Sequence, residues 1–136
     1  MLRRTLFSWL TAAAAFGQDQ SKWPPKLTVE EIERYLEKKD KVFWLDVREP
    51  GELAEFGALP GYVNIPLGQL ESRLNEIPKD KLILTVCQRA MRAGKAADIL
   101  EKHGYKVTGR CAMLDWKEKG RQVVYPKGSE SAKPTQ

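Results

Sequence analysis

The 136-residue sequence lacks the features that mark multidomain, repetitive or nucleic-acid-binding proteins. Its length leaves room for one domain, and a hydrophobic content of 42% is enough for one modest core. We find no internal repeat. The formal net charge is +5, but lysines and arginines alternate with acids, as in EEIERYLEKKDK at 30–41. Because no basic stripe is interleaved with aromatic residues, we expect no binding to nucleic acid.

The sequence also lacks an uncharged apolar run that could comfortably span a bilayer. The longest candidate, TLFSWLTAAAAFG at 5–17, follows the basic MLRR and precedes the polar QDQSK. This order is typical of a secretory signal, so we expect residues 1–17 to be a signal peptide and the mature chain to be periplasmic or secreted, without a stable membrane span after processing. Retention of the stretch as a membrane anchor is the alternative.

Cysteine and histidine are scarce, with two and one copies respectively. Two cysteines in an oxidising compartment would suggest one disulfide, but a chain with this apolar content does not need such a cross-link. The one histidine, His103, precedes Gly104 at the end of a helical pattern, which favours a role in ending the helix over a role in catalysis. Cys87 and Cys111 must therefore be judged by their positions.

The rest of the sequence alternates between strand-like and helix-like segments. Apolar, β-branched runs predict strands at 42–47, 62–65, 81–86 and 105–108. Helical spacing predicts helices at 28–39, where Thr28 and Glu31 form a capping box, and at 52–56, 67–74 and 113–119, with another between Cys87 and His103. This alternation predicts a three-layer α/β domain over 27–126 with a mainly parallel sheet, between a linker at 18–26 and a disordered tail at 127–136.

Cys87 lies where the apolar run KLILTV ends and the next helical pattern begins. In a parallel sheet, ligands bind beyond the carboxyl ends of the strands, which is where this cysteine is expected. The free N–H groups and the dipole of the following helix, together with Arg89 and Arg92, would favour the thiolate form. The position therefore predicts a reactive cysteine rather than a core filler.

Four motifs in order resemble the rhodanese, or thiosulfate sulfurtransferase, family over almost the whole mature chain. LDVREPGELAEF resembles the family's "DVRE" segment, and GALPGYVNIPL resembles "GHIPGAINIPL". CQRAMRAGKAADIL resembles the family's cysteine loop and helix, and MLDWKEKG resembles its late "AWKxxG" helix. The resemblance implies a single rhodanese-like domain with a mainly parallel five-stranded sheet flanked by helices.

The resemblance also implies a mechanism with Cys87 as the nucleophile. In this family the cysteine takes the outer sulfur of thiosulfate or a similar anionic donor, forms a persulfide and passes the sulfur to cyanide or a thiol. No metal or organic cofactor is implied. The N–H groups of the loop would surround the persulfide; the matching loop residues are Gln88, Arg89, Ala90, Met91 and Arg92.

The remaining site residues carry supporting roles or open alternatives. Arg92 matches the arginine that closes the family's loop, whereas Arg89 is either a solvated charge or an anion contact. We expect Asp46 and Arg48 to form a structural ion pair near the site. Ala90 stands where the family often has glycine, which costs about 1 kcal/mol or more if the position needs a positive φ.

Cys111 replaces one of two glycines that the family commonly has after its last strand. If the two cysteines emerged at the same edge of the sheet, Cys111 could resolve a persulfide or sulfenate on Cys87 as a disulfide, which requires Cα atoms within about 7 Å. The alternative is a small buried filler. Both interpretations remain open from the sequence.

Two other functions compete with sulfur transfer. Cysteine phosphatases separate the cysteine from the arginine by five residues, but only Gln88 to Met91 separate Cys87 from Arg92 here, and Val86 stands where a histidine would precede the cysteine. An arsenate or phosphate-ester enzyme is therefore a remote alternative. A non-catalytic rhodanese-like binding module is the nearer one, because the loop is substituted.

Overall fold

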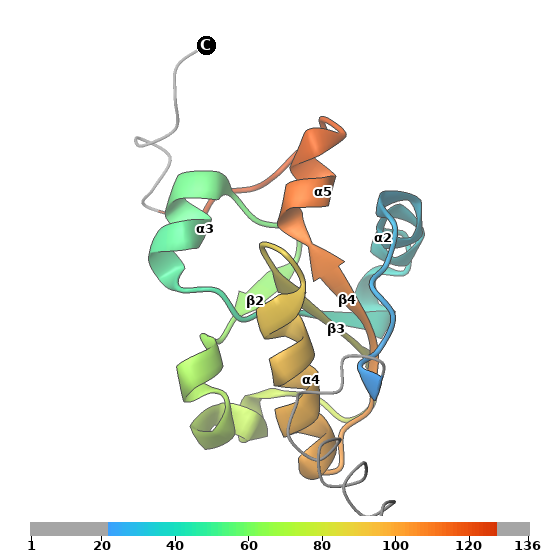
Figure 1. Ribbon diagram of the computed structural model, residues 1–136, viewed down its shortest axis with the longest axis vertical. Helices are drawn as coiled ribbons and strands as arrows, with labels where there is room; N and C mark the ends of the chain where they lie inside the picture. The colour runs from blue at the N-terminus through green and yellow to red at the C-terminus, as the bar shows by residue number, and fades with distance from the viewer. Residues whose placement is uncertain (1–21, 128–136) are drawn as a thin grey trace, which may run out of the picture.

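Four parallel strands form the sheet of this protein, whose computed structural model describes residues 22–127 (Figure 1). They are β1 (Val42–Asp46), β2 (Tyr62–Asn64), β3 (Leu82–Cys87) and β4 (Val107–Ala112), in the order β2-β1-β3-β4. The predicted signal peptide at 1–17, residues 18–21 of the predicted linker, and all but the first residue of the predicted tail lie outside the described residues. Within 22–127, no helix is both long and apolar enough to cross a membrane.

The sheet of the described residues has one strand fewer than the five that the resemblance implied. Two isolated bridges are present besides these strand pairs. Lys26 pairs in parallel with Arg110 of β4, whereas Ala58 and Val124 pair with each other in antiparallel orientation outside the four strands. Pro24 and Pro25 have no N–H to donate, which limits pairing before Lys26. Residues 22–26, predicted as linker, nevertheless pack against the domain, and Trp23 is buried.

Helices cover both faces of the sheet, as the alternating pattern predicted. They are α2 (Val29–Leu36), α3 (Pro50–Phe56), α4 (Met91–Lys102) and α5 (Met113–Glu118). The capping box of Thr28 and Glu31 is present at the start of α2. His103 is the C-cap of α4, but its imidazole lies 3.5 Å from Glu71 rather than on the helix carbonyls.

Short 3-10 helices replace the α-helix predicted at 67–74. They are η4 (Leu67–Gln69) and η5 (Glu71–Glu76); a third, η3 (Lys39–Lys41), precedes β1. Pro66 and Pro78 flank this connection, and its hydrogen bonds close over three residues, as from Leu70 N–H to Leu67 O at 3.2 Å. Leucines at helical spacing thus mark a tight connection of 3-10 turns, in which Leu70 is buried, and not a full α-helix.

Neighbouring residues of β1 and of β3 contribute to two separate cores. Leu45 and Ile83 pack under α4, which lies in front of the sheet in Figure 1. Trp44 and Leu84 pack on the opposite face with α2 and with Trp116 of α5. Because successive strand residues point to opposite faces, this gives the three layers predicted from the sequence and confirms Trp44 and Trp116 as core residues.

Candidate active site

Cys87 is the last residue of the central strand β3, at the carboxyl edge of the sheet where α3 and α5 also lie (Figure 1). Its Sγ accepts a hydrogen bond of 3.2 Å from the N–H of Ala93, in the first turn of α4. Thr85 Oγ1 donates to the carbonyl of Ala93 at 3.0 Å, which holds this turn against β3. The sulfur therefore lies at the amino end of a 12-residue helix, whose dipole favours negative charge.

A pocket of about 500 Å³ opens over this cysteine. Cys87 is only 1% exposed, so it forms the floor of the pocket and not its rim. Arg89 and Met91 are exposed around it, and among the described residues Arg89 has no hydrogen bond or ion pair. The lining consists of Phe56, Cys87, Gln88, Arg89, Met91, Arg92 and Leu114.

Arg92 binds Glu52 of α3 from the lining of the pocket. Its Nη1 and Nη2 donate to the two carboxylate oxygens of Glu52 at 2.7 and 2.8 Å. These hydrogen bonds lower the pKa of Glu52 to about 2, although partial burial opposes the shift. Arg92 therefore links α3 to α4 across the pocket, and its charge is balanced by a carboxylate.

Asp46 and Arg48 form a buried ion pair behind the loop. Both side chains are fully buried, and Arg48 Nη2 lies 2.8 Å from Asp46 Oδ2. The same guanidinium donates to Gln88 Oε1 at 3.0 Å and to the carbonyl of Gly57 at 2.9 Å. It thereby fixes the first loop residue and the end of α3 relative to β1.

Ala90 ends the loop in the left-handed conformation, with φ 68° and ψ 7°. The position therefore has the positive φ at which alanine costs more than glycine. Arg110 of β4 donates from Nη1 to the carbonyl of Ala90 at 2.9 Å. Sequence reasoning missed Arg110, because this residue lies beyond the strand predicted at 105–108 and a single charged residue gives no sign of what it contacts.

Asn64 was also missed. At the end of β2, its Nδ2 donates to the carbonyls of Asp46 and Arg48 at 2.9 and 2.8 Å. These bonds fix the turn that carries the buried ion pair. The NIP segment resembled the family's motif, but the resemblance gave the asparagine no role.

The family model for the rhodanese-like domain matches residues 28–117. This chain belongs to that family. An uncharacterized Bacillus subtilis protein, YqhL, is 50% identical over 60 residues, which cover 44% of this chain and 47% of YqhL, so the match spans about half of that relative. A sulfurtransferase of Allochromatium vinosum is 29% identical over 101 residues, covering 73% of this chain and 94% of its own.

The fold agrees with that of solved rhodanese-family structures. The crystal structure of the single-domain sulfurtransferase RDL2 of Saccharomyces cerevisiae superposes with a TM-score of 0.64 at 27% identity. The alignment covers 77% of this chain and 98% of RDL2. The predicted single-domain rhodanese architecture is therefore confirmed.

The second cysteine of this rhodanese-like domain faces away from the first. In the parallel pairing of β3 and β4, Cys111 lies opposite Val86, and both belong to the core on the α2 face. Cys87 belongs to the core on the α4 face. Both thiols are free, and burial raises the pKa of Cys111 far above its usual range. This register gives no support to the hypothesis that Cys111 is a redox partner of Cys87, because it places the two side chains on opposite faces of the sheet.

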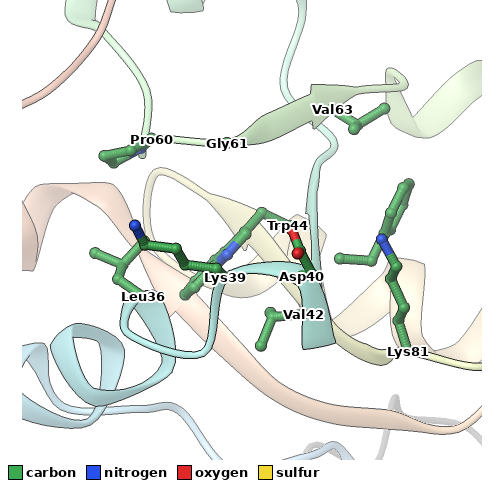
Figure 2. Close-up of a pocket in the computed structure, with 10 residues that line it drawn as sticks. Leu36, Lys39, Asp40, Val42, Trp44, Pro60, Gly61, Val63 and Lys81 are labelled. Atoms are coloured by element: carbon green, nitrogen blue, oxygen red, sulfur yellow. The ribbon is translucent and has the colours of Figure 1, made fainter.

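A second pocket, of about 530 Å³, lies at the other end of the rhodanese sheet, where β1 begins. Figure 2 shows Lys39 and Lys81 on its two sides, with Trp44 and Asp40 between them. Its lining contains no cysteine, serine or histidine. Among residues 22–127, no group of three or more histidine, cysteine or acidic side chains could hold a metal ion. The candidate site is therefore the pocket over Cys87.

Proposed function

We propose that this protein is a sulfurtransferase that accepts a sulfur atom from thiosulfate or a similar sulfane-sulfur donor as a persulfide on Cys87. It then passes that sulfur to cyanide or to a thiol. The observation that carries the proposal is the hydrogen bond from Ala93 N–H to Cys87 Sγ at the floor of a pocket that Arg89 borders. Family membership and the sulfurtransferases among its relatives support the same reaction type.

In the first step, the Cys87 thiolate attacks the outer sulfur of thiosulfate. The S–S bond of the donor breaks, and its electron pair leaves with sulfite. The product is a persulfide whose terminal sulfur is negative and lies about 2 Å further into the pocket. Among the described residues, the hydrogen bond to Sγ comes from Ala93. We expect N–H groups of residues 88–92 to donate to the added sulfur.

In the second step, a thiolate or cyanide attacks the terminal sulfur. The persulfide bond breaks, its electrons return to Cys87, and the acceptor leaves as a persulfide or as thiocyanate. Arg89 is the exposed cation of the pocket and is suited to attract the anionic donor. Arg92 forms an ion pair with Glu52, and Arg48 forms one with Asp46, so we assign both arginines a structural role around the pocket.

Mass spectrometry tests this proposal directly. After incubation with thiosulfate and removal of excess reagent, the wild-type protein gains the mass of one sulfur atom, and cyanide then releases it as thiocyanate. Cys87→Ala removes both signals, while Cys111→Ala, which changes the other thiol, retains them. Absence of adduct and of thiocyanate in the wild type would leave a non-catalytic binding module, a function consistent with the 1% exposure of Cys87.

We also propose that the protein is exported, on the strength of the sequence at 1–17 alone. The proposal is tested by fractionating cells that naturally produce the protein and sequencing the N-terminus of the recovered chain. Export predicts a chain that starts near residue 18 in the periplasm or medium. A chain that begins at Met1 in the soluble cell extract overturns it.

A further inference from the structure

Arg110 connects three parts of the domain from the middle of β4. Its Nε donates to the carbonyl of Pro24 at 2.7 Å, and its Nη1 donates to the carbonyl of Ala90 at 2.9 Å. The guanidinium also lies 5.2 Å from the centre of the Trp23 ring. Three contacts in three directions match a planar, forked donor, and the single ammonium of a lysine could not replace them all.

The contact to Ala90 falls on the strained residue of the loop. A residue with a Cβ adopts φ 68° at a cost, and such conformations persist where the surroundings fix them. The carbonyl of Ala90 accepts a hydrogen bond from Arg110 and a second one, of 3.2 Å, from Gly94 N–H. The orientation of this peptide therefore fixes the first turn of α4. Ala93, which donates to Cys87 Sγ, belongs to that turn.

The contact to Pro24 ties this peptide to the chain that precedes α2. Trp23 Nε1 donates to Asp98 of α4 at 2.9 Å. The Trp23 ring packs so closely on Gly94 that a Cβ added to this glycine would lie 2.2 Å from a ring carbon. Gly94 thus allows the N-terminal segment to lie directly on the first turns of α4. Arg110 joins both sides of this contact, because it binds the segment at Pro24 and the loop at Ala90.

We propose that Arg110 is a positioning residue for Cys87, which holds Ala90 in the left-handed conformation and so keeps the Ala93 N–H directed at the sulfur. The expected effect of Arg110 on turnover rests on the proposed function, whereas its expected effect on the reactivity of the Cys87 sulfur does not. Arg110 does not line the pocket over Cys87, so it acts through the loop and not on the substrate. Its loss therefore changes kcat and leaves KM almost unchanged.

A double-mutant cycle between Arg110 and Ala90 tests the proposal. Two rates are measured for wild type, Arg110→Ala, Ala90→Gly and the double variant: alkylation of Cys87 by iodoacetamide at fixed pH, followed at the Cys87 peptide, and turnover with thiosulfate and cyanide. We expect Arg110→Ala to lower both rates about tenfold, as for loss of a charge-assisted hydrogen bond. In the Ala90→Gly background the loss falls to about two- to threefold, because glycine adopts a positive φ without help.

Two further variants serve as controls. Arg110→Lys keeps the charge but loses the fork, so its rates stay within about threefold of those of Arg110→Ala. Arg121→Ala removes a guanidinium that also binds a carbonyl, that of Lys119 at 2.9 Å, but outside the pocket, and both rates stay at the wild-type value. If Arg110→Ala does not fold, the same cycle with Arg110→Lys carries the comparison.

The outcomes separate the two proposals. Equal losses with Ala90 in place and in the Ala90→Gly background would mean that Arg110 does not act through Ala90, and full rescue by lysine would mean that it acts through its charge. Either result would overturn the positioning role. An unchanged alkylation rate in Arg110→Ala would overturn it as well. If the wild type transfers no sulfur while the alkylation cycle behaves as expected, the proposed function fails and the role of Arg110 stands.

Discussion

Arg48 and Asp46 are joined by two side-chain hydrogen bonds, Nε to Oδ1 at 2.9 Å and Nη2 to Oδ2 at 2.8 Å, with neither side chain exposed. A buried pair of this kind is costly to break, because removal of one partner leaves the other charge without compensation. We expect Asp46→Ala to lower the free energy of unfolding by about 3–5 kcal/mol, measured by urea denaturation.

The matched control for this prediction is a pair at the surface. Arg121 Nε lies 2.6 Å from Glu33 Oε2, with side chains 33% and 41% exposed. We expect Glu33→Ala to change the free energy of unfolding by no more than about 1 kcal/mol, since solvent screens such pairs. A similar cost for both variants would contradict the buried-charge explanation.

The Glu52–Arg92 pair predicts a pH dependence of stability. Glu52 has a pKa of about 2 in the folded protein, below its ordinary 4.5, chiefly because Arg92 hydrogen-bonds its carboxylate. A lowered folded-state pKa means that the contribution is fully present above pH 4.5 and is lost as the pH falls toward 2. The pair is about one-quarter to one-third exposed, so we expect a screened contribution of about 1 kcal/mol at pH 7.

Glu52→Gln isolates this contribution. The variant is less stable than the wild type at pH 7, and the difference in unfolding free energy shrinks as the pH is lowered through 4.5 toward 2. Urea titrations at several pH values measure it. If the difference in unfolding free energy stays constant over this range, the contribution of the Glu52–Arg92 pair to stability does not depend on the charge of Glu52.

The alternation of strands and helices and the position of Cys87 could be predicted because they depend on local patterns. The apolar run before Cys87, the small residues at helical spacing after it and the capping box at Thr28 each reflect burial or capping within one element. By contrast, the strand predicted at 105–108 lies at 107–112, since Gly109 and Arg110 do not resemble strand residues. Gly109 is required there, because a Cβ would lie 2.8 Å from Leu27.

The contacts that shape the site could not be predicted, because each joins residues distant in sequence. Arg48 meets Gln88, and Arg92 meets Glu52, each across 40 positions, and Arg110 meets Pro24 across 86. A single sequence shows the charges but not their partners. The register of β3 and β4, which decides that Cys111 faces away from Cys87, likewise depends on the bulge between Ile83 and Leu84.

The opposite orientation of the two cysteines gives a prediction about thiol chemistry. Without denaturant, one thiol, that of Cys87, reacts with a thiol reagent, whether or not the protein has first been treated with reductant. Cys111→Ala leaves this count and the Cys87 alkylation rate unchanged, and lowers the free energy of unfolding by about 1 kcal/mol through the small cavity that it creates. A reductant-dependent rise in reactive thiols would restore the disulfide hypothesis.

Gly94 and Gly51 provide the last test, because both are helical glycines in different surroundings. A Cβ on Gly94 would lie 2.2 Å from the Trp23 ring, whereas a Cβ on Gly51 would meet no atom within 4 Å. Gly94→Ala must displace Trp23 from α4, at an expected cost of about 1–3 kcal/mol in unfolding free energy. Gly51→Ala is expected to be neutral or stabilising by up to about 1 kcal/mol, since alanine favours helix. Because the displaced Trp23 also contacts Arg110, Gly94→Ala slows the alkylation of Cys87 in the folded protein, and Gly51→Ala does not.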